Sequence, residues 1–170
     1  MIETAFFLIL AAVCVIASIL VITQRNPVAS AIYLIFAFFS LAGIFLLLNA
    51  QFIAITQVLV YAGAIMVLFL FVIMLLNLEK EDRRITRVSS KKIAGVAFGV
   101  ILAVQLGMIF HSVFQIGREG NFPPAKVEAM GNTETLARVL FTHYLLPFEI
   151  TSILLLVAII GAVILAKREV

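Results

Sequence analysis

The sequence predicts an all-α integral membrane protein with five transmembrane helices, and three observations support this fold class. The chain has 170 residues, of which 64% are hydrophobic and only 12% are charged. Its mean hydropathy is +1.23. Its apolar residues form long continuous runs, which short polar connectors separate. A soluble domain is about 45–50% apolar and about 25% charged, so a soluble fold could not hide this surface, whereas a lipid bilayer can.

Five apolar segments are long enough for a helix to cross a hydrocarbon core of about 30 Å, which takes roughly 20 residues. The segments are residues 5–23, 28–48, 52–78, 93–116 and 145–166. We expect helices because backbone polar groups in lipid must be satisfied within the segment. Strands of a β-barrel would instead alternate between apolar and polar residues. The whole chain, residues 1–170, is therefore predicted to form a single membrane domain.

The connectors between these segments differ in length and polarity. A short turn ends at Pro27, which suits the first turn of a helix, and the turn at 49–51 is tight and uncharged. Residues 79–92 form a polar loop and residues 117–144 form the longest connector. Within that connector, 133–143 is expected to form a short amphipathic helix.

The distribution of Lys and Arg predicts the orientation, because cytoplasmic loops are enriched in these residues. If loop 79–92 is cytoplasmic, nine basic residues lie on that side: Arg25, Lys80, Arg83, Arg84, Arg87, Lys91, Lys92, Lys167 and Arg168. The other side then carries only three, which are Arg118, Lys126 and Arg138. The N-terminus and loop 117–144 are therefore predicted to lie outside, and the C-terminus in the cytoplasm.

Chemistry-bearing residues are scarce, and this restricts the function classes. No predicted helix has Lys, Arg, Asp or Glu near its centre, whereas a transporter acting alone should carry buried charges. Cys14 is the only cysteine, which excludes a multi-cysteine zinc or iron–sulfur site within the chain. His111 and His143 lack suitably spaced partner ligands. We therefore expect no catalytic residue, no metal site and no nucleic-acid binding.

The third segment carries the most informative polar residues. Tyr61 is predicted to lie near the middle of the membrane, with Gln57 four residues earlier and therefore on the same face of an α-helix. The stretch Ala62-Gly63-Ala64 has almost no side-chain bulk. One interpretation is a packing face with a Tyr61–Gln57 hydrogen bond. The other is a weak point where a π-bulge forms and a polar face becomes hydrated, since π-bulges favour functional sites.

The residues of this segment and others resemble the subunit J (chain 6) family of proton-translocating NADH:quinone oxidoreductase, which is respiratory complex I. The most specific match is VYAGAIMVLF at 60–69, continuing to MLLN at 74–77. Supporting matches are NPV at 26–28, GNTETLA at 131–137, and LFT at 140–142 with PFEITS at 147–152. The resemblance covers nearly the whole chain in order.

The resemblance implies a membrane-arm subunit in a bacterial inner (plasma) membrane, next to subunits A, H and K. It implies that this chain binds no cofactor, since flavin, iron–sulfur clusters and quinone belong to partner subunits. It also implies that the third helix couples quinone reduction to proton translocation by switching between π-bulged and regular winding. Tyr61, Gly63 and Val67 are then the hinge and gate candidates. Position 57 is Gln or Glu in the family, and Gln57 favours gating of water over direct proton transfer.

Two alternatives to this interpretation remain. The first is a related membrane subunit of a cation antiporter or of a membrane-bound hydrogenase, since those assemblies share parts of this architecture. The second is a small transporter that acts alone. The absence of charges in the middle of the predicted helices and of internal repeats argues against the second alternative.

Overall fold

The computed structural model describes residues 2–76, 90–113 and 124–167, and every element in these ranges is a helix. The chain divides into two compact units, one formed by Met1–Leu75 with Pro124–Val170 and the other by Leu76–Pro123. The first unit contains α1 to α4 and α6 to α8, together with a π-helical segment, η1. The second contains α5, Ser90–Val113.

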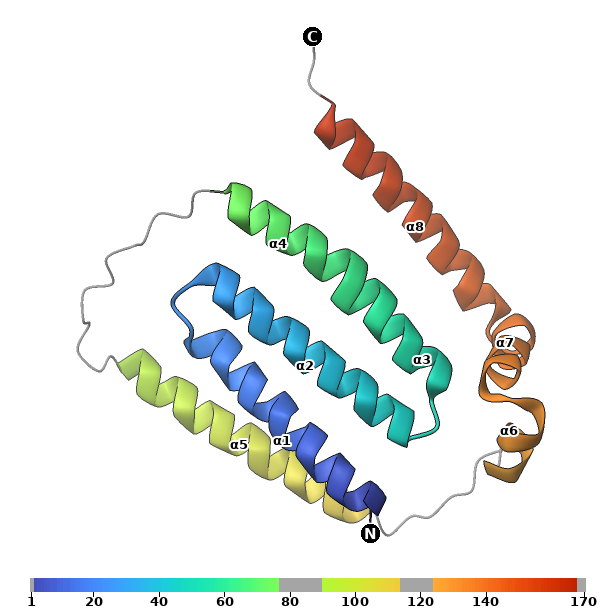
Figure 1. Ribbon diagram of the computed structural model, residues 1–170, viewed down its shortest axis with the longest axis horizontal. Coiled ribbons are helices and arrows are strands. Elements are labelled where there is room, and N and C mark those ends of the chain that lie inside the picture. Colours follow the sequence, from blue (N-terminus) through green and yellow to red (C-terminus); the bar gives the residue numbers. More distant parts are fainter. Residues whose placement is uncertain (1, 77–89, 114–123, 168–170) are drawn as a thin grey trace. The chain divides into compact units, whose positions relative to one another are not determined.

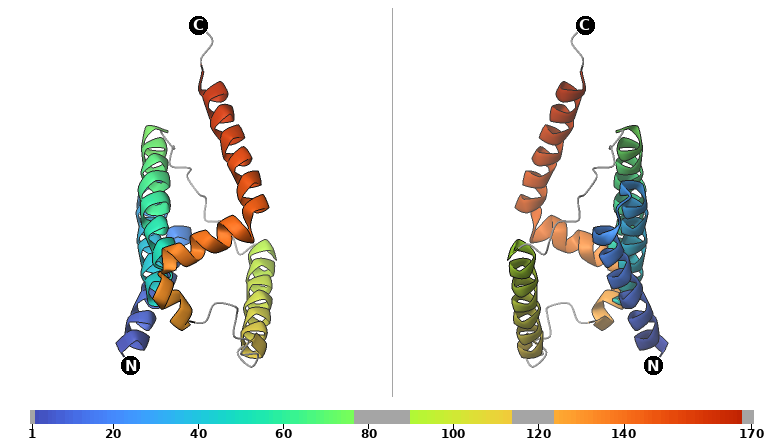
Figure 2. Two further views of the ribbon diagram at one scale, coloured as in Figure 1. Left: turned by 90° about the vertical axis from the view of Figure 1, so that its right-hand side faces the viewer. Right: turned by 90° about the vertical axis from the view of Figure 1, so that its left-hand side faces the viewer.

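Three long helices pack side by side in the first unit (Figure 1). They are α1 (Ile2–Thr23), α2 (Pro27–Leu47) and a continuous helix built from α3 (Gln51–Thr56), η1 (Gln57–Ile65) and α4 (Met66–Leu75). Helix α2 lies in the middle and contacts both neighbours. Figure 2 shows the three helices edge-on as one layer.

The turns that join these helices follow from local sequence. Asn26 caps α2, since its Oδ1 accepts hydrogen bonds from the backbone N–H groups of Val28 at 2.9 Å and Ala29 at 3.4 Å. At the other end of α2, Asn49 adopts a left-handed conformation with φ of 57°. The N–H of Asn49 bonds to Leu46 O and that of Ala50 to Phe45 O, which is the Schellman arrangement that ends a helix.

The contacts between the long helices are made by small side chains. The buried apolar residues in the described part of the chain are Ala17, Ala31, Ala37, Ala42, Ala54, Ala62 and Met66. Between α1 and α2, the Ser30 hydroxyl donates to Val21 O at 2.7 Å, and the Cys14 Sγ lies 3.8 Å from Ala37 O. Close packing of small residues is the arrangement expected in lipid. There, burying a large apolar side chain between helices gains no hydrophobic free energy, because the lipid tails are equally apolar.

Three further helices complete the first unit. Helix α6 spans Pro124–Met130, α7 spans Asn132–Thr142, and α8 spans Leu145–Ala166. Helix α7 confirms the amphipathic helix expected at 133–143, whereas α6 was not predicted. Helix α7 contacts α3, α6 and α8, and Figure 2 shows it running away from the three-helix layer toward the start of α8.

In the described ranges, four helices are long and apolar enough to cross a membrane: α1, α2, the combined helix Gln51–Leu75, and α8. The fourth predicted segment, 93–116, overlaps α5, in which a shorter apolar stretch, Gly95–Ile109, is described. Residues 114–116 of that segment and most of loop 79–92 lie outside the described residues. The count of five spans, the single domain and the orientation of the termini therefore stay predictions.

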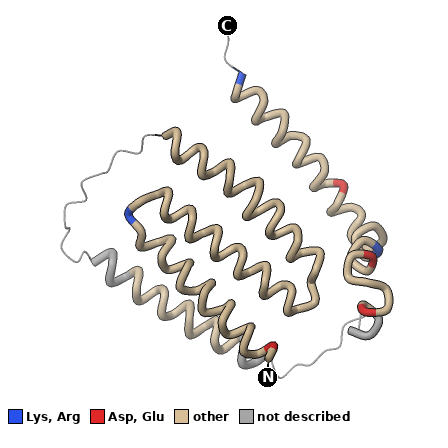
Figure 3. Tube along the Cα trace, in the orientation of Figure 1, with Lys and Arg blue, Asp and Glu red and all other residues tan. Residues whose placement is uncertain are grey.

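In the described long helices the few charged residues lie within two turns of an end, whereas the short helices α6 and α7 carry Glu128, Glu134 and Arg138 within their length (Figure 3). Glu3 lies in the first turn of α1, Arg25 in the α1–α2 turn, and Lys167 directly after α8. Large apolar side chains therefore cover the outer faces, and the described part of α8 has no buried residue at all. These surfaces suit lipid or neighbouring subunits and not water.

Candidate functional site

The third long helix contains nine residues of π-helix, Gln57–Ile65, between two α-helical parts. The segment closes on Met66, whose backbone N–H bonds to the carbonyls of Gly63 and Tyr61. A bond between residue 66 and residue 61 is the i to i−5 pattern of a π-helix. The sequence left a regular packing face and a π-bulge as alternatives, and the structure has π winding over the stretch in question.

Glycine at position 63 suits this winding. A Cβ built on Gly63 would lie 3.2 Å from the carbonyl oxygen of Val58, five residues earlier. That distance is shorter than an ordinary carbon–oxygen contact, so a larger residue would force this carbonyl to move. The same carbonyl is the one that i to i−5 bonding directs toward residue 63. Glycine at position 63 therefore avoids a close contact within the π segment.

Gln57, the first residue of η1, is nearly buried, with 6% of its surface exposed. Its side-chain amide has no hydrogen-bond partner among the described residues. Every completely enclosed side-chain nitrogen or oxygen in the described residues does have a partner. The Gln57 amide is therefore not completely enclosed by the described residues.

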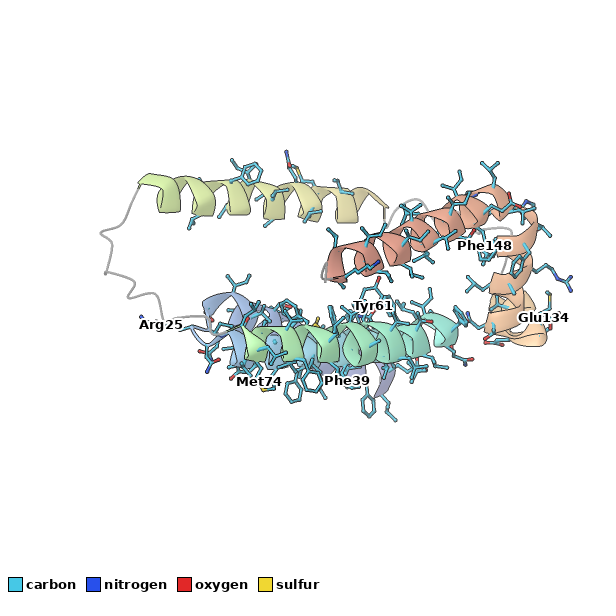
Figure 4. The ribbon with its side chains drawn as sticks, turned by 90° about the horizontal axis from the view of Figure 1, so that it is seen from above. Arg25, Phe39, Tyr61, Met74, Glu134 and Phe148 are labelled. Atoms are coloured by element: carbon cyan, nitrogen blue, oxygen red, sulfur yellow. The ribbon has the colours of Figure 1, made fainter. Side chains whose placement is uncertain are left out.

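Tyr61 is 46% exposed, and its ring meets that of Phe38 on α2 edge-on, with centroids 5.8 Å apart. Figure 4 shows Tyr61 on one side of the combined helix, with the labelled Phe39 and Met74 on the opposite side. In the described structure the Tyr61 hydroxyl has no hydrogen-bond partner. The expected Tyr61–Gln57 hydrogen bond is therefore wrong for this state. The two side chains have different surroundings, because Gln57 packs into the core while the half-exposed Tyr61 ring lies against Phe38.

Val67 lies in the first turn of α4, just after the π segment, and is 47% exposed. Its neighbour Met66 is 3% exposed and packs into the core. The structure thus brings Gln57, Tyr61, Gly63 and Val67 together on one continuous helix, but it does not place them on one face. Gln57 faces the packed side, and Tyr61 and Val67 are half-exposed.

Asn132 is a contact residue that sequence reasoning did not single out. Its side-chain Oδ1 accepts a hydrogen bond of 3.1 Å from the backbone N–H of Phe52, which lies 80 residues away near the start of α3. Asparagine at the start of a helix is an ordinary local signal for capping that helix. No pattern in the sequence indicates that this one serves a different helix.

Other side chains offer little chemistry in the described residues. No three His, Cys, Asp or Glu side chains gather there in a way that could hold a metal ion. Glu134 and Arg138 of α7 form an ion pair at 3.4 Å, and both side chains are largely exposed. Exposed pairs of this kind contribute little stability. The expectation that the chain has no cofactor or metal of its own stays a prediction.

The fold and this segment define the class: a multi-pass membrane protein whose most unusual feature is a π-wound, glycine-containing helix. The chain belongs to the family of NADH-ubiquinone/plastoquinone oxidoreductase chain 6, since the model of that family matches residues 17–165. The resemblance drawn from the sequence is thereby confirmed.

Individual relatives agree with this assignment. The chain is 40% identical over 168 residues to NAD(P)H-quinone oxidoreductase chain 6 of Synechocystis sp., covering 96% of this chain and 80% of that protein. It is 36% identical over 164 residues to NADH-quinone oxidoreductase subunit J of Rhodobacter capsulatus, covering 96% and 81%. It is 37% identical over 169 residues to F(420)H(2) dehydrogenase subunit J of Methanosarcina mazei, covering 98% and 92%.

Proposed function

We propose that this chain is a membrane-arm subunit of a proton-translocating quinone oxidoreductase and that its third helix gates a hydrated proton path by changing its winding. The observation that carries the proposal is the π segment Gln57–Ile65, which bears two polar side chains without partners in the described chain. The relatives are named as subunits of oxidoreductases and dehydrogenases, which supports a redox-driven complex as the setting of the proposal.

The polar side chains argue for water at this segment. A buried amide that lacks a hydrogen bond costs about 1–3 kcal/mol, so Gln57 is expected to meet water or a polar group of a neighbouring subunit. Tyr61 presents a second hydroxyl from the exposed side of the same segment. Together they can support a short chain of water molecules within an otherwise apolar helix.

The change of winding supplies the gate. When a π turn becomes an α turn, that turn accommodates one residue fewer. The part of the helix that follows then rotates by about 100° relative to the part before it. Val67, a half-exposed apolar residue directly after the segment, would then move across the path. Gly63 makes the π state accessible because it adds no Cβ against the Val58 carbonyl. Quinone reduction in the partner subunits would bias the two windings differently.

The chain itself is proposed to perform no redox step and to contribute no catalytic residue. Flavin, iron–sulfur clusters and quinone are assigned to partner subunits, and the adjacent membrane partners are proposed to be subunits A, H and K. The complex would lie in the inner (plasma) membrane of a bacterium. The names of the relatives include NADH, NAD(P)H and F(420)H(2), so the proposal concerns coupling and not the electron donor.

The experiment compares Gly63→Leu with Ala64→Leu in membrane vesicles that contain the assembled complex. Ala64 is the matched control because it is exposed, lies in the same segment and already carries a Cβ. We expect Gly63→Leu to lower the number of protons pumped per electron pair, while Ala64→Leu keeps it. Unchanged pumping and electron transfer in Gly63→Leu would disprove the gate.

A further inference from the structure

The third helix begins without a capping side chain of its own. Its N-cap residue, Ala50, offers no side-chain hydrogen bond, so the first backbone N–H groups of α3 need partners from elsewhere. One of them, that of Phe52, donates to Asn132 Oδ1 at 3.1 Å. Phe52 is the second residue of the helix, which is one of the positions that a local capping side chain ordinarily serves. Asn132 therefore acts as a cap supplied from a distant part of the chain.

The start of α7 is built so that Asn132 is available for this contact. Gly131 precedes it with φ of 85°, a conformation that side chains rarely adopt. The Thr135 hydroxyl donates to Gly131 O at 2.8 Å, and Thr135 is 7% exposed. The Thr135 hydroxyl thus bonds within its own helix, while the Asn132 side chain reaches α3.

The opposite end of α7 is held as well. Phe141 near its end meets Phe148 in the first turn of α8, edge-on, with centroids 5.1 Å apart. Figure 4 labels Phe148 and Glu134 at this part of the molecule. Helix α7 thus contacts both the start of α3 and the start of α8.

We propose that Asn132 is a positioning residue that anchors the first turn of the third helix. A change of winding in Gln57–Ile65 then rotates α4 and leaves α3 in place. Changing the winding by one residue turns the two ends of a helix relative to each other by about 100° and shifts them by about 1.5 Å. Both ends pack against α2, but only α3 is also contacted by α7, so the end at α4 is the one expected to turn. Helix α3 is only six residues long and lies between the anchor and the π segment.

This inference rests on the proposed winding change for its consequence, but the capping contact itself does not depend on it. The test uses amide hydrogen–deuterium exchange of the assembled complex, at rest and during turnover. The variants are Asn132→Ala, which removes the acceptor, and Asn132→Asp, which keeps one. Thr133→Ala is the matched control, since Thr133 is an exposed neighbour on α7.

In the native complex, exchange should change on turnover within 57–70 and stay constant within 51–56. In Asn132→Ala, exchange within 51–56 should become about fivefold faster and respond to turnover, and fewer protons should be pumped per electron pair. Asn132→Asp should restore both properties, and Thr133→Ala should match the native complex. Equal protection of 51–56 in the Ala variant and the control would overturn the anchor, even if 57–70 still responds. No response of 57–70 in the native complex would instead overturn the winding change, and with it the consequence assigned to Asn132.

Discussion

Replacing Gln57 by Glu and by Leu distinguishes a hydrated third helix from a dry one. All three side chains are similar in size, so packing against α2 is nearly preserved, while polarity runs from apolar through neutral to ionisable. Gln57 is 6% exposed, and its amide has no partner in the described chain. In a dry site, a charged side chain at the centre of a membrane helix costs at least about 2.5–3.5 kcal/mol, or roughly a factor of 100 in an equilibrium constant.

The hydrated account predicts that Gln57→Glu assembles normally and still pumps, because water solvates the carboxyl group. It predicts that Gln57→Leu also assembles but pumps fewer protons per electron pair, because the polar amide that supports the chain of water molecules is lost. The assays are the amount of intact complex on native gels, its thermal stability, and proton uptake by vesicles during electron transfer. The opposite pattern, with loss of assembly in the Glu variant and normal pumping in the Leu variant, would show that the segment is dry and refute the reasoning.

Three further predictions concern other features of the chain. Tyr61→Phe removes a hydroxyl without a partner but keeps the ring contact with Phe38, so coupling should fall modestly and thermal stability should not change in the same two assays. Asn26→Ala removes both capping bonds at the start of α2 and should destabilise the helix by about 1 kcal/mol, measured as a lower melting temperature of the complex, whereas Asn26→Asp should not. A cysteine at position 86 should be inaccessible to an impermeant thiol reagent in intact cells and one at position 125 accessible; labelling of position 86 from outside would reverse the assigned orientation.

The parts of the fold that the sequence predicted are those fixed by local patterns. Long apolar runs predicted four helices whose observed bounds differ from expectation by only a few residues, and Asn26-Pro27 indicated the start of α2. The amphipathic pattern after Gly131 predicted α7. Each of these signals depends on neighbours within one or two turns, so a single sequence contains all the information needed.

The candidate site was predicted less completely, because it depends on winding and on contacts between distant residues. The small stretch around Gly63 indicated a weak point, but composition does not decide between π and α winding. The spacing of four residues predicted a hydrogen bond between Gln57 and Tyr61, but in the structure the first side chain is buried and the second half-exposed, and they form no hydrogen bond. The contact from Asn132 to Phe52 spans 80 residues and leaves no local pattern.

The central claim is that the segment Gln57–Ile65 has two windings and that the redox state of the complex selects between them. The most direct measurement is a pair of structures of the assembled membrane arm, one at rest and one trapped during turnover, resolved well enough to trace this backbone. The account predicts i to i−5 bonding at Met66 in one state and i to i−4 bonding in the other, with Val67 displaced around the helix axis between them. The same winding and the same Val67 position in both states would contradict it.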